Sequence, residues 1–239
     1  EILSGLVGSE MCIRDRPEGT PATSRLQRAG DGLAEGVSVA PGVQAVSWRP
    51  STICFLNGFF AMALRATIYK AELNVADTDR HYYGSHSLTV ARHPSETDER
   101  MMVRLVAYAL HAQEELAFTK GLSDTDEPDL WVKDLTGAIK LWIEVGQPEE
   151  RRILRACGRA DEVIVYCYGG SASKIWWDGV RNKLERTRNL KVVNLPSDQT
   201  RALAKLAERT MQLNANISDG VVYFSADKGE VSVEPEAWR

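Results

Sequence analysis

The chain has 239 residues, enough for one large or two small domains, and its 44% hydrophobic and 26% charged residues are ordinary for a globular protein with a sizeable core. A formal net charge of −4 at pH 7 argues against strong overall attraction to nucleic acid or to an anionic membrane. The four cysteines form neither a CxxC pair nor a metal-ligand spacing, so no oxidising compartment is required and a cytoplasmic protein is expected.

Residues 1–61 differ in character from the rest, with scattered Gly, Pro, Ser and Arg and no sustained periodicity. The first sixteen residues, EILSGLVGSEMCIRDR, look like a translated sequencing adaptor. We therefore predict that residues 1–61 are a non-native or disordered leader and that the native start is Met62. The competing interpretation is a signal peptide, because the apolar run from Ile53 to Leu64 has h-region length. That run is too short to cross a bilayer, and we expect no membrane segment.

The first predicted elements after Met62 are two strands of a hairpin. Ala63 to Val75 alternates as a half-buried strand does and is rich in β-branched and aromatic residues. Turn residues follow from Asp77 to Arg80, and Tyr82 to Arg92 predicts the returning strand.

A helix is predicted after this hairpin, with Ser95 as a candidate N-cap. Its apolar stripe runs from Met101 to Leu110 at helical spacing. Glu99 falls at the edge of that stripe, where a carboxylate can reach a neighbouring cleft, and Glu96 lies farther round. The alternative is that both glutamates simply favour the positive end of the helix dipole.

Two strand-like segments then carry one acid each, after a weak strand or helix-end pattern at Leu116–Phe118 and an acidic loop at 121–127. Asp129 lies on the first arm, 128–133, and Glu144 on the second, 140–146, which predicts a hairpin. Two nearby carboxylates of this kind can hold a divalent metal, since such oxygens suit Mg²⁺. The alternatives stay open: Asp129 as a turn or cap residue, and Glu144 paired with an arginine of the following helix.

The next elements alternate between helix and strand, which predicts right-handed crossovers and parallel neighbours. They are a helix from Pro148 to about Ala160, a strand Glu162–Tyr168, a helix Ser171–Thr187, a strand Leu190–Leu195 and a helix Ser197–Met211 capped by Ser197. Residues 212–238 predict short strands that need a partner sheet. The natural partner is the first hairpin, so we predict an accessory antiparallel β subdomain from residues 62–92 and 212–238.

One segment, residues 174–191, is strongly basic, with six Lys or Arg against two acids and Trp176 and Trp177 near its start. Phosphate contacts combined with base stacking use such a mixture, which makes Lys174, Trp176, Arg181 and Lys183 candidate nucleic-acid contacts. The alternative is a solvated helix face with one tryptophan in the core.

From Met62 to its end the chain resembles the YaeQ family of bacterial proteins. The similarity is carried by the segments ALRATIYKAELNVADTDR, LTVARHPSETDERMMVRL, LWIEVGQPEERR, KIWWD and ISDGVVYFS. The resemblance implies one domain over residues 62–239. It also implies an α/β, restriction-endonuclease-like PD-(D/E)XK fold over residues 95–211: a mixed sheet flanked by helices, in the order helix, three strands, helix, strand.

Aligned with that superfamily pattern, Asp129 is the acid of the PD pair and Glu144 is the (D/E) residue. Gly146 stands where the pattern expects lysine. The first hypothesis is a Mg²⁺-dependent phosphodiesterase or nuclease, with Asp129 and Glu144 as metal ligands. Glu99 or Glu96 would assist, and Arg152, in the following helix, would contact phosphate.

The missing lysine and the acidic net charge favour two alternatives. One is a catalytically inactive nuclease-fold protein that binds nucleic acid or a protein partner. The other is a structural or interaction protein without nucleic acid.

Overall fold

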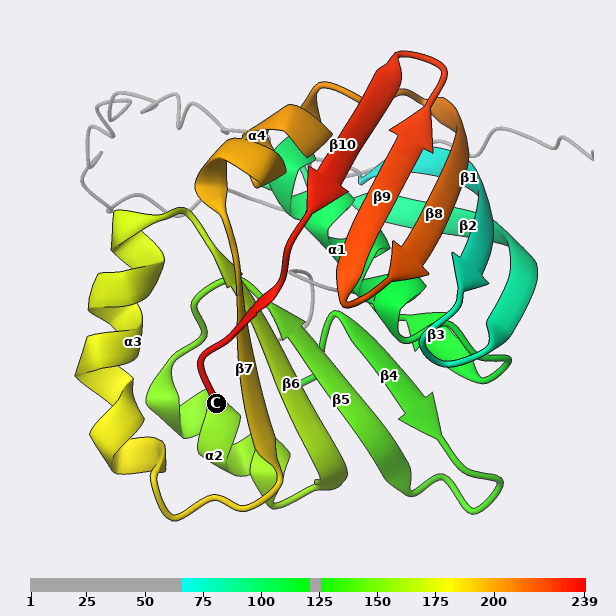
Figure 1. The fold of residues 1–239 in the computed structure, drawn as a ribbon. Helices are drawn as coiled ribbons and strands as arrows, with labels where there is room; N and C mark the ends of the chain where they lie inside the picture. The colour runs from blue at the N-terminus through cyan, green and yellow to red at the C-terminus, as the bar shows by residue number, and fades with distance from the viewer. Residues whose placement is uncertain (1–65, 121–125) are drawn as a thin grey trace, which may run out of the picture. The chain divides into compact units, whose positions relative to one another are not determined.

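The computed structural model describes residues 66–120 and 126–239 of the chain (Figure 1). The predicted leader, with its apolar run and Met62, lies outside the described residues, and so does most of the predicted acidic loop. Among the residues described, no helix is both long enough and apolar enough to cross a membrane.

Most of the predicted strands and helices are present, and the main differences lie at their ends. The elements are β1 (Thr67–Asp77), β2 (Tyr82–Arg92), α1 (Asp98–Leu110), β3 (Leu116–Phe118), β4 (Leu130–Lys133), β5 (Ile139–Val145), α2 (Glu150–Cys157), β6 (Ala160–Tyr168), α3 (Ser171–Leu184), β7 (Leu190–Leu195), α4 (Ser197–Ala204), β8 (Thr210–Ser218), β9 (Val221–Ala226), β10 (Gly229–Val233) and β11 (Glu236–Ala237).

A six-stranded sheet has the order β11-β7-β6-β5-β4-β3 (Figure 1). Strands β5, β6 and β7 are parallel and are joined through α2 and α3, as the alternation of helices and strands predicts. The middle strand β6 is buried over most of its length because both of its faces are covered, which explains its near-continuous apolar run. Strands β3 and β4 extend the sheet antiparallel to β5.

A second sheet joins strands from both ends of the described chain, in the order β10-β9-β8-β1-β2. The first hairpin does pair with the C-terminal strands, but the sheet is mixed and not antiparallel as predicted. Strand β8 lies parallel to β1, with Lys70 opposite Thr210. The chain leaves α4 near the start of β1, as the hydrogen bond from the Lys70 N–H to the Arg209 carbonyl shows, so β8 must run in the same direction.

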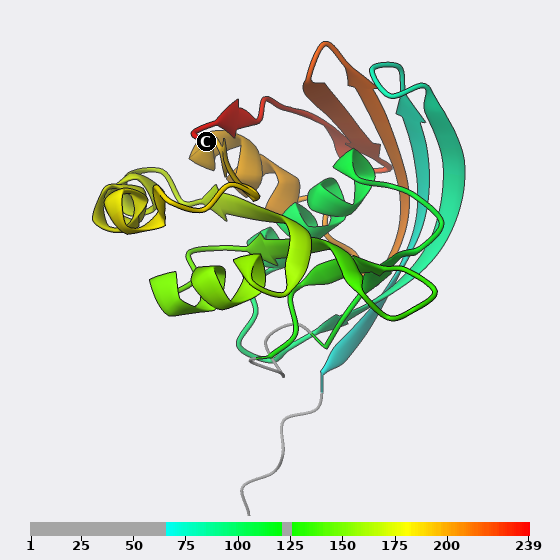
Figure 2. The ribbon, with the colours of Figure 1, turned by 90° about the horizontal axis from the view of Figure 1, so that it is seen from below.

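Helix α1 lies between the two sheets, and Figure 2 shows the five-stranded sheet curving around it. Nine consecutive α1 residues, from Met101 to Ala109, are buried, and all of them except Arg104 share one core with Leu73 of β1, Phe224 of β9 and Ile143 of β5. The terminal strands therefore share their core with the six-stranded sheet through α1. A second core lies on the opposite face of the six-stranded sheet, beneath α2 and α3.

Two predicted N-caps are wrong, and α2, α3 and α4 each end earlier than predicted, at Cys157, Leu184 and Ala204. Helix α1 begins at Asp98 with Thr97 as its N-cap, because the Thr97 hydroxyl accepts the Arg100 N–H at 3.2 Å, whereas the Ser95 hydroxyl bonds His93. Helix α4 begins after Pro196 without a side-chain cap and ends at Ala204. Residues from Thr210 onward alternate between exposed and buried and form β8, which is why the predicted helix is too long.

Candidate functional site

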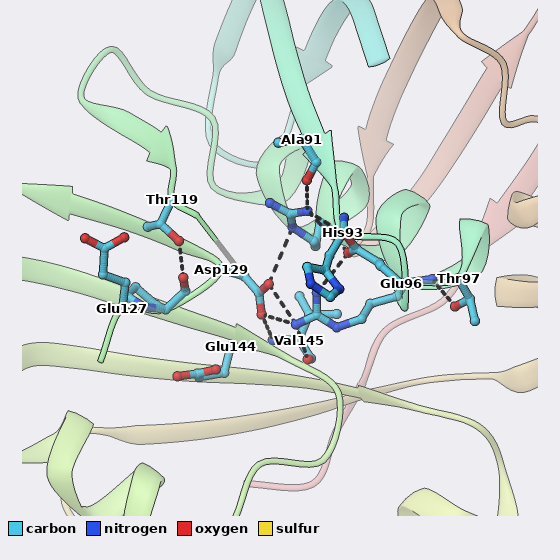
Figure 3. Close-up of polar contacts among 12 residues, drawn as sticks. Ala91, His93, Glu96, Thr97, Thr119, Glu127, Asp129, Glu144 and Val145 are labelled. Carbon is cyan, nitrogen blue, oxygen red and sulfur yellow. Dashed lines mark hydrogen bonds and ion pairs between the residues drawn. The ribbon is translucent and has the colours of Figure 1, made fainter. Parts of the chain in front are cut away.

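Asp129 lies immediately before β4 and is only 1% exposed (Figure 3). Both of its carboxylate oxygens accept Nη2 of Arg100 at 2.8 Å, and Oδ2 also accepts the backbone N–H of Val145 at 2.8 Å. Nε of Arg104 lies 3.5 Å from Oδ1. The carboxylate thus meets two guanidinium groups and a backbone donor where β5 ends.

Glu96 completes this cluster from the turn before α1 and is 4% exposed. Its carboxylate accepts Nη1 of Arg100 at 2.8 Å, Nη1 of Arg104 at 3.2 Å and the backbone N–H of His93 at 3.2 Å. The two carboxylates and two guanidinium groups therefore form a buried cluster with zero net formal charge. We call it the acid–arginine cluster; its members are Glu96, Asp129, Arg100 and Arg104.

The electrostatics of the cluster follow from its burial. Burial alone would lower the pKa of Arg100, but the charges and hydrogen bonds of Asp129 and Glu96 outweigh it and raise that pKa above its usual value. Arg104 is 1% exposed, and its Nη2 has no hydrogen-bond partner within the described part of the chain. Its guanidinium lies 5.2 Å from the centre of the Phe118 ring, a cation–π contact that offsets part of this loss.

Glu144 faces the other side of the sheet. Its Oε1 accepts the indole N–H of Trp142 and Nε of Arg152, each at 2.8 Å. Burial raises the pKa of Glu144 above its usual value, Arg152 opposes that rise, and the negative charge of Asp129 adds to it. The pairing with an arginine of the following helix is one of the two predicted alternatives for Glu144. Arg152 also donates to the carbonyl of Glu127 at 2.7 Å.

The two acids have different hydrogen-bond partners, although the charge of Asp129 still acts on Glu144. Trp142 and Glu144 alternate along β5 with Ile143 and Val145, which face α1, so Glu144 points toward α2 while Asp129 bonds a side chain of α1. In the part of the chain that the structure describes, no group of three or more His, Cys, Asp or Glu side chains is placed to hold a metal ion. Both oxygens of Asp129 and Oε1 of Glu144 accept N–H donors of arginines, so a shared Mg²⁺ would have to displace these partners.

Gly146, at the position where the predicted PD-(D/E)XK pattern would place lysine, has φ +110°, in the region that favours glycine. Its N–H donates to the Tyr166 carbonyl at 2.8 Å, which fixes the turn out of β5. A Cβ here would meet nothing within 4 Å, so backbone conformation and not space opposes a side chain. A lysine at this position would therefore be strained by the backbone.

Glu99 stands apart from the acid–arginine cluster. Its Oε1 accepts the Thr200 hydroxyl at 2.6 Å, a contact between α1 and α4. Glu96 lies in the cluster and Glu99 in this interhelical bond, so the structure gives the two glutamates different partners.

The predicted nucleic-acid contacts divide into two groups. Lys174 and Arg181 are exposed on α3, whereas Lys183 is exposed but bonds Glu150 at 2.7 Å. Trp176 turns inward, packs against the second core and donates its indole N–H to the Pro148 carbonyl at 2.9 Å. The predicted alternative of one tryptophan in the core therefore describes Trp176.

Trp177, the neighbouring residue, meets a tryptophan that the sequence did not single out. Its ring stacks on Trp238 with centroids 6.5 Å apart, and an open cavity of about 590 Å³ beside them is lined by Lys174 and Arg181. We call these four residues the tryptophan surface. Trp238 follows β11, which has only two residues and pairs with the edge of β7. Such a short strand leaves no periodic pattern, although a tryptophan next to the C-terminal residue was a visible signal.

Comparisons with known proteins agree with one another. The model of the family described as YaeQ protein matches residues 62–235. Curated relatives are uncharacterised YaeQ proteins of Escherichia coli (strain K12), 48% identical, and Salmonella typhi, 46% identical, each over 178 residues that cover 74% of this chain and 98% of the relative.

Two solved structures are similar to this one. The YaeQ protein from Xanthomonas axonopodis pv. citri is 50% identical with a TM-score of 0.71, over 73% of this chain and 98% of that one. The YaeQ protein from Pseudomonas syringae is 40% identical with a TM-score of 0.70, over 73% of this chain and 96% of that one.

Proposed function

The chain belongs to the YaeQ family, and from this premise we propose that it is a nucleic-acid-binding protein on a nuclease-like fold without metal-dependent cleavage. The order α1, β3, β4, β5, α2, β6 agrees with the helix, three strands, helix, strand expected of a PD-(D/E)XK core, which supports the nuclease-like part of the proposal. The fold alone does not specify an activity.

The arginine partners of the acids support the absence of cleavage. A metal nuclease needs carboxylate oxygens free to bind Mg²⁺, which then lowers the pKa of a bound water and neutralises charge on the phosphate. Here Arg100 occupies both oxygens of Asp129, and Arg152 occupies one oxygen of Glu144. Because residue 146 is glycine, the lysine expected in the PD-(D/E)XK pattern is absent as well.

The tryptophan surface is the observation that carries the binding function. Lys174 has no acidic partner within 4 Å among the residues described, and Arg181 has only a loose contact with Asp178 at 3.6 Å, both side chains more than half exposed. Free cationic groups beside an aromatic face are the elements with which proteins hold a phosphate backbone and its bases. Residues 174–191 carry a local excess of basic residues despite the negative total charge, and the cavity itself is lined by the acids Asp178 and Glu236 as well as by Lys174 and Arg181.

Fluorescence anisotropy with labelled oligonucleotides, at about 50 to 200 mM salt, tests binding by the full chain. The variant is Lys174→Glu with Arg181→Glu, and its charge-matched control is Lys70→Glu with Lys228→Glu on the five-stranded sheet. We expect affinity to fall as salt rises and to be lost only in the first variant. Equal affinity in both double variants would overturn the assigned surface, and no binding at low salt would leave a protein partner as the alternative.

Calorimetric titration of Mg²⁺ or Mn²⁺ into the full chain tests the second part of the proposal. We expect no heat of binding from the wild type or from Glu144→Gln, and no cleavage of the labelled oligonucleotides with either metal. Heat that disappears in Glu144→Gln, together with cleavage, would instead establish the metal-dependent nuclease.

A further inference from the structure

We infer that the nucleic acid held by the tryptophan surface is single-stranded, with one base on each side of the Trp177–Trp238 pair. This inference rests on the proposed function and adds the class of ligand and its arrangement. The relevant surface joins α3 to the C-terminal segment that lies along β7.

Two cavities meet at the tryptophan pair. The first, of about 590 Å³, extends from the pair toward Lys174, and the second, of about 350 Å³, extends toward Asn182 and Arg239. Both are lined by Trp177, Trp238 and Arg181 and by otherwise different side chains. The two rings and the arginine therefore separate two spaces, each with an aromatic wall.

This arrangement suits bases that are not already stacked and paired. Trp177 and Trp238 line both cavities, with their indole planes inclined by 29°, so each cavity offers an aromatic side chain to a flat base. Bases in a duplex are covered by their neighbours, whereas an unpaired strand can present its bases to aromatic side chains. Arg181 stands between the two spaces, where the phosphate that links two successive nucleotides would lie.

Backbone contacts hold the C-terminal segment and so position Trp238. The Trp238 N–H donates to the Val192 carbonyl at 2.8 Å, and the Arg239 N–H donates to the same carbonyl at 3.2 Å. The Arg239 guanidinium donates to the carbonyls of Glu185 and Thr187 at the end of α3. Because the last two residues are fixed to both β7 and α3, Trp238 needs no ordering when a base arrives, which favours affinity.

Four labelled probes of equal length test the inference on the full chain: single-stranded DNA, the same sequence as RNA, its duplex, and a single strand with one abasic site. We expect single strands to bind more tightly than duplex, and a strand with one abasic site at the bound position to bind about 5- to 150-fold more weakly, the range for one lost base stack. Trp238→Leu should weaken binding of the base-containing strand by a similar factor. Trp238→Phe, which keeps an aromatic face, should retain most of the affinity.

The possible results separate the two proposals. Equal affinities for single strand, duplex and abasic strand, unchanged by Trp238→Leu, would overturn the stacking arrangement and leave nucleic-acid binding intact. Absence of binding by every probe at low salt would overturn both. If Trp238→Leu unfolds, the comparison of abasic with intact strands on the wild-type protein still decides, because it changes the ligand alone. The ratio of the affinities for the DNA strand and the RNA strand shows which sugar the surface prefers.

Discussion

The Asp129→Asn variant tests whether Asp129 is a structural acid or a metal ligand. The Asp129 carboxylate is 1% exposed and accepts Arg100 through both oxygens and the Val145 N–H, all at 2.8 Å. An asparagine has nearly the same shape, but it carries no charge and replaces one acceptor by an NH₂ donor. Arg100 and Arg104 would then share Glu96 as their only acid, which leaves a net positive charge buried.

The expected loss follows from this imbalance. Breaking a buried ion pair by neutralising one partner costs about 3 to 5 kcal/mol, because the opposite charge stays out of water without compensation. Unfolding free energies of typical domains are about 5 to 15 kcal/mol, so the variant should lose a large part of its stability. Urea unfolding followed by far-ultraviolet circular dichroism measures this difference at pH 7.

The matched control is Asp161→Asn, which removes an exposed acid paired with Lys140 at 2.9 Å. Its carboxylate is 68% exposed, so we expect a change within about 0.5 kcal/mol. Carboxylates arranged to bind metal repel one another in its absence, and neutralising one of them stabilises the protein. Unchanged or increased stability of Asp129→Asn would therefore refute the structural role and favour a metal site.

Three further results are expected from the same unfolding assay. Burial holds the pKa of His111 at about 4, against 6.5 for the unperturbed group. The contribution of neutral His111 to the unfolding free energy is therefore complete above pH 6.5 and falls by up to about 3 kcal/mol as the pH drops toward 4. His111→Gln should remove this pH dependence. Glu144→Gln should change the unfolding free energy by less than about 1 kcal/mol, because burial already disfavours the charged form of Glu144. A loss of stability as large as that of Asp129→Asn would contradict this prediction. Gly146→Lys, which introduces the lysine of the predicted pattern, should cost about 1 to 2 kcal/mol through its positive φ and yield no Mg²⁺-dependent cleavage; a fully stable, cleaving variant would contradict both statements.

The strands were more predictable from sequence than the way they pair. Tyr82–Arg92 and Leu190–Leu195 have the predicted bounds, because alternation and an apolar run both mark a strand locally. The parallel pairing of β1 with β8 joins residues about 140 positions apart, as the Asn74–Asn214 hydrogen bond shows. No local pattern encodes that pairing, because it depends on where α4 delivers the chain.

The acids of the site were recognised, but two of their partners were missed. Arg100 and Arg104 interrupt an apolar stripe and resemble surface residues of α1, yet Arg104 is 1% exposed. Their spacing was a usable signal, because Arg100 and Arg104 are four residues apart within α1 and side chains at that distance meet on one helix face. The arginines considered from sequence lie after Pro148, and of these Arg152 pairs with Glu144.

The position of the acid–arginine cluster bears on how the proposed function depends on the fold. The cluster bonds α1 to the segment before β4 and to the end of β5, through Asp129 and the Val145 backbone. A buried ion cluster is no more stabilising than an apolar replacement, so its contribution is to fix these three segments in one arrangement. The tryptophan surface belongs to α3 and the C-terminal segment, on the opposite face of the six-stranded sheet. Changes in the acids should therefore alter stability and leave the intrinsic affinity of that surface for nucleic acid unchanged, whereas in a nuclease the two properties would depend on the same residues.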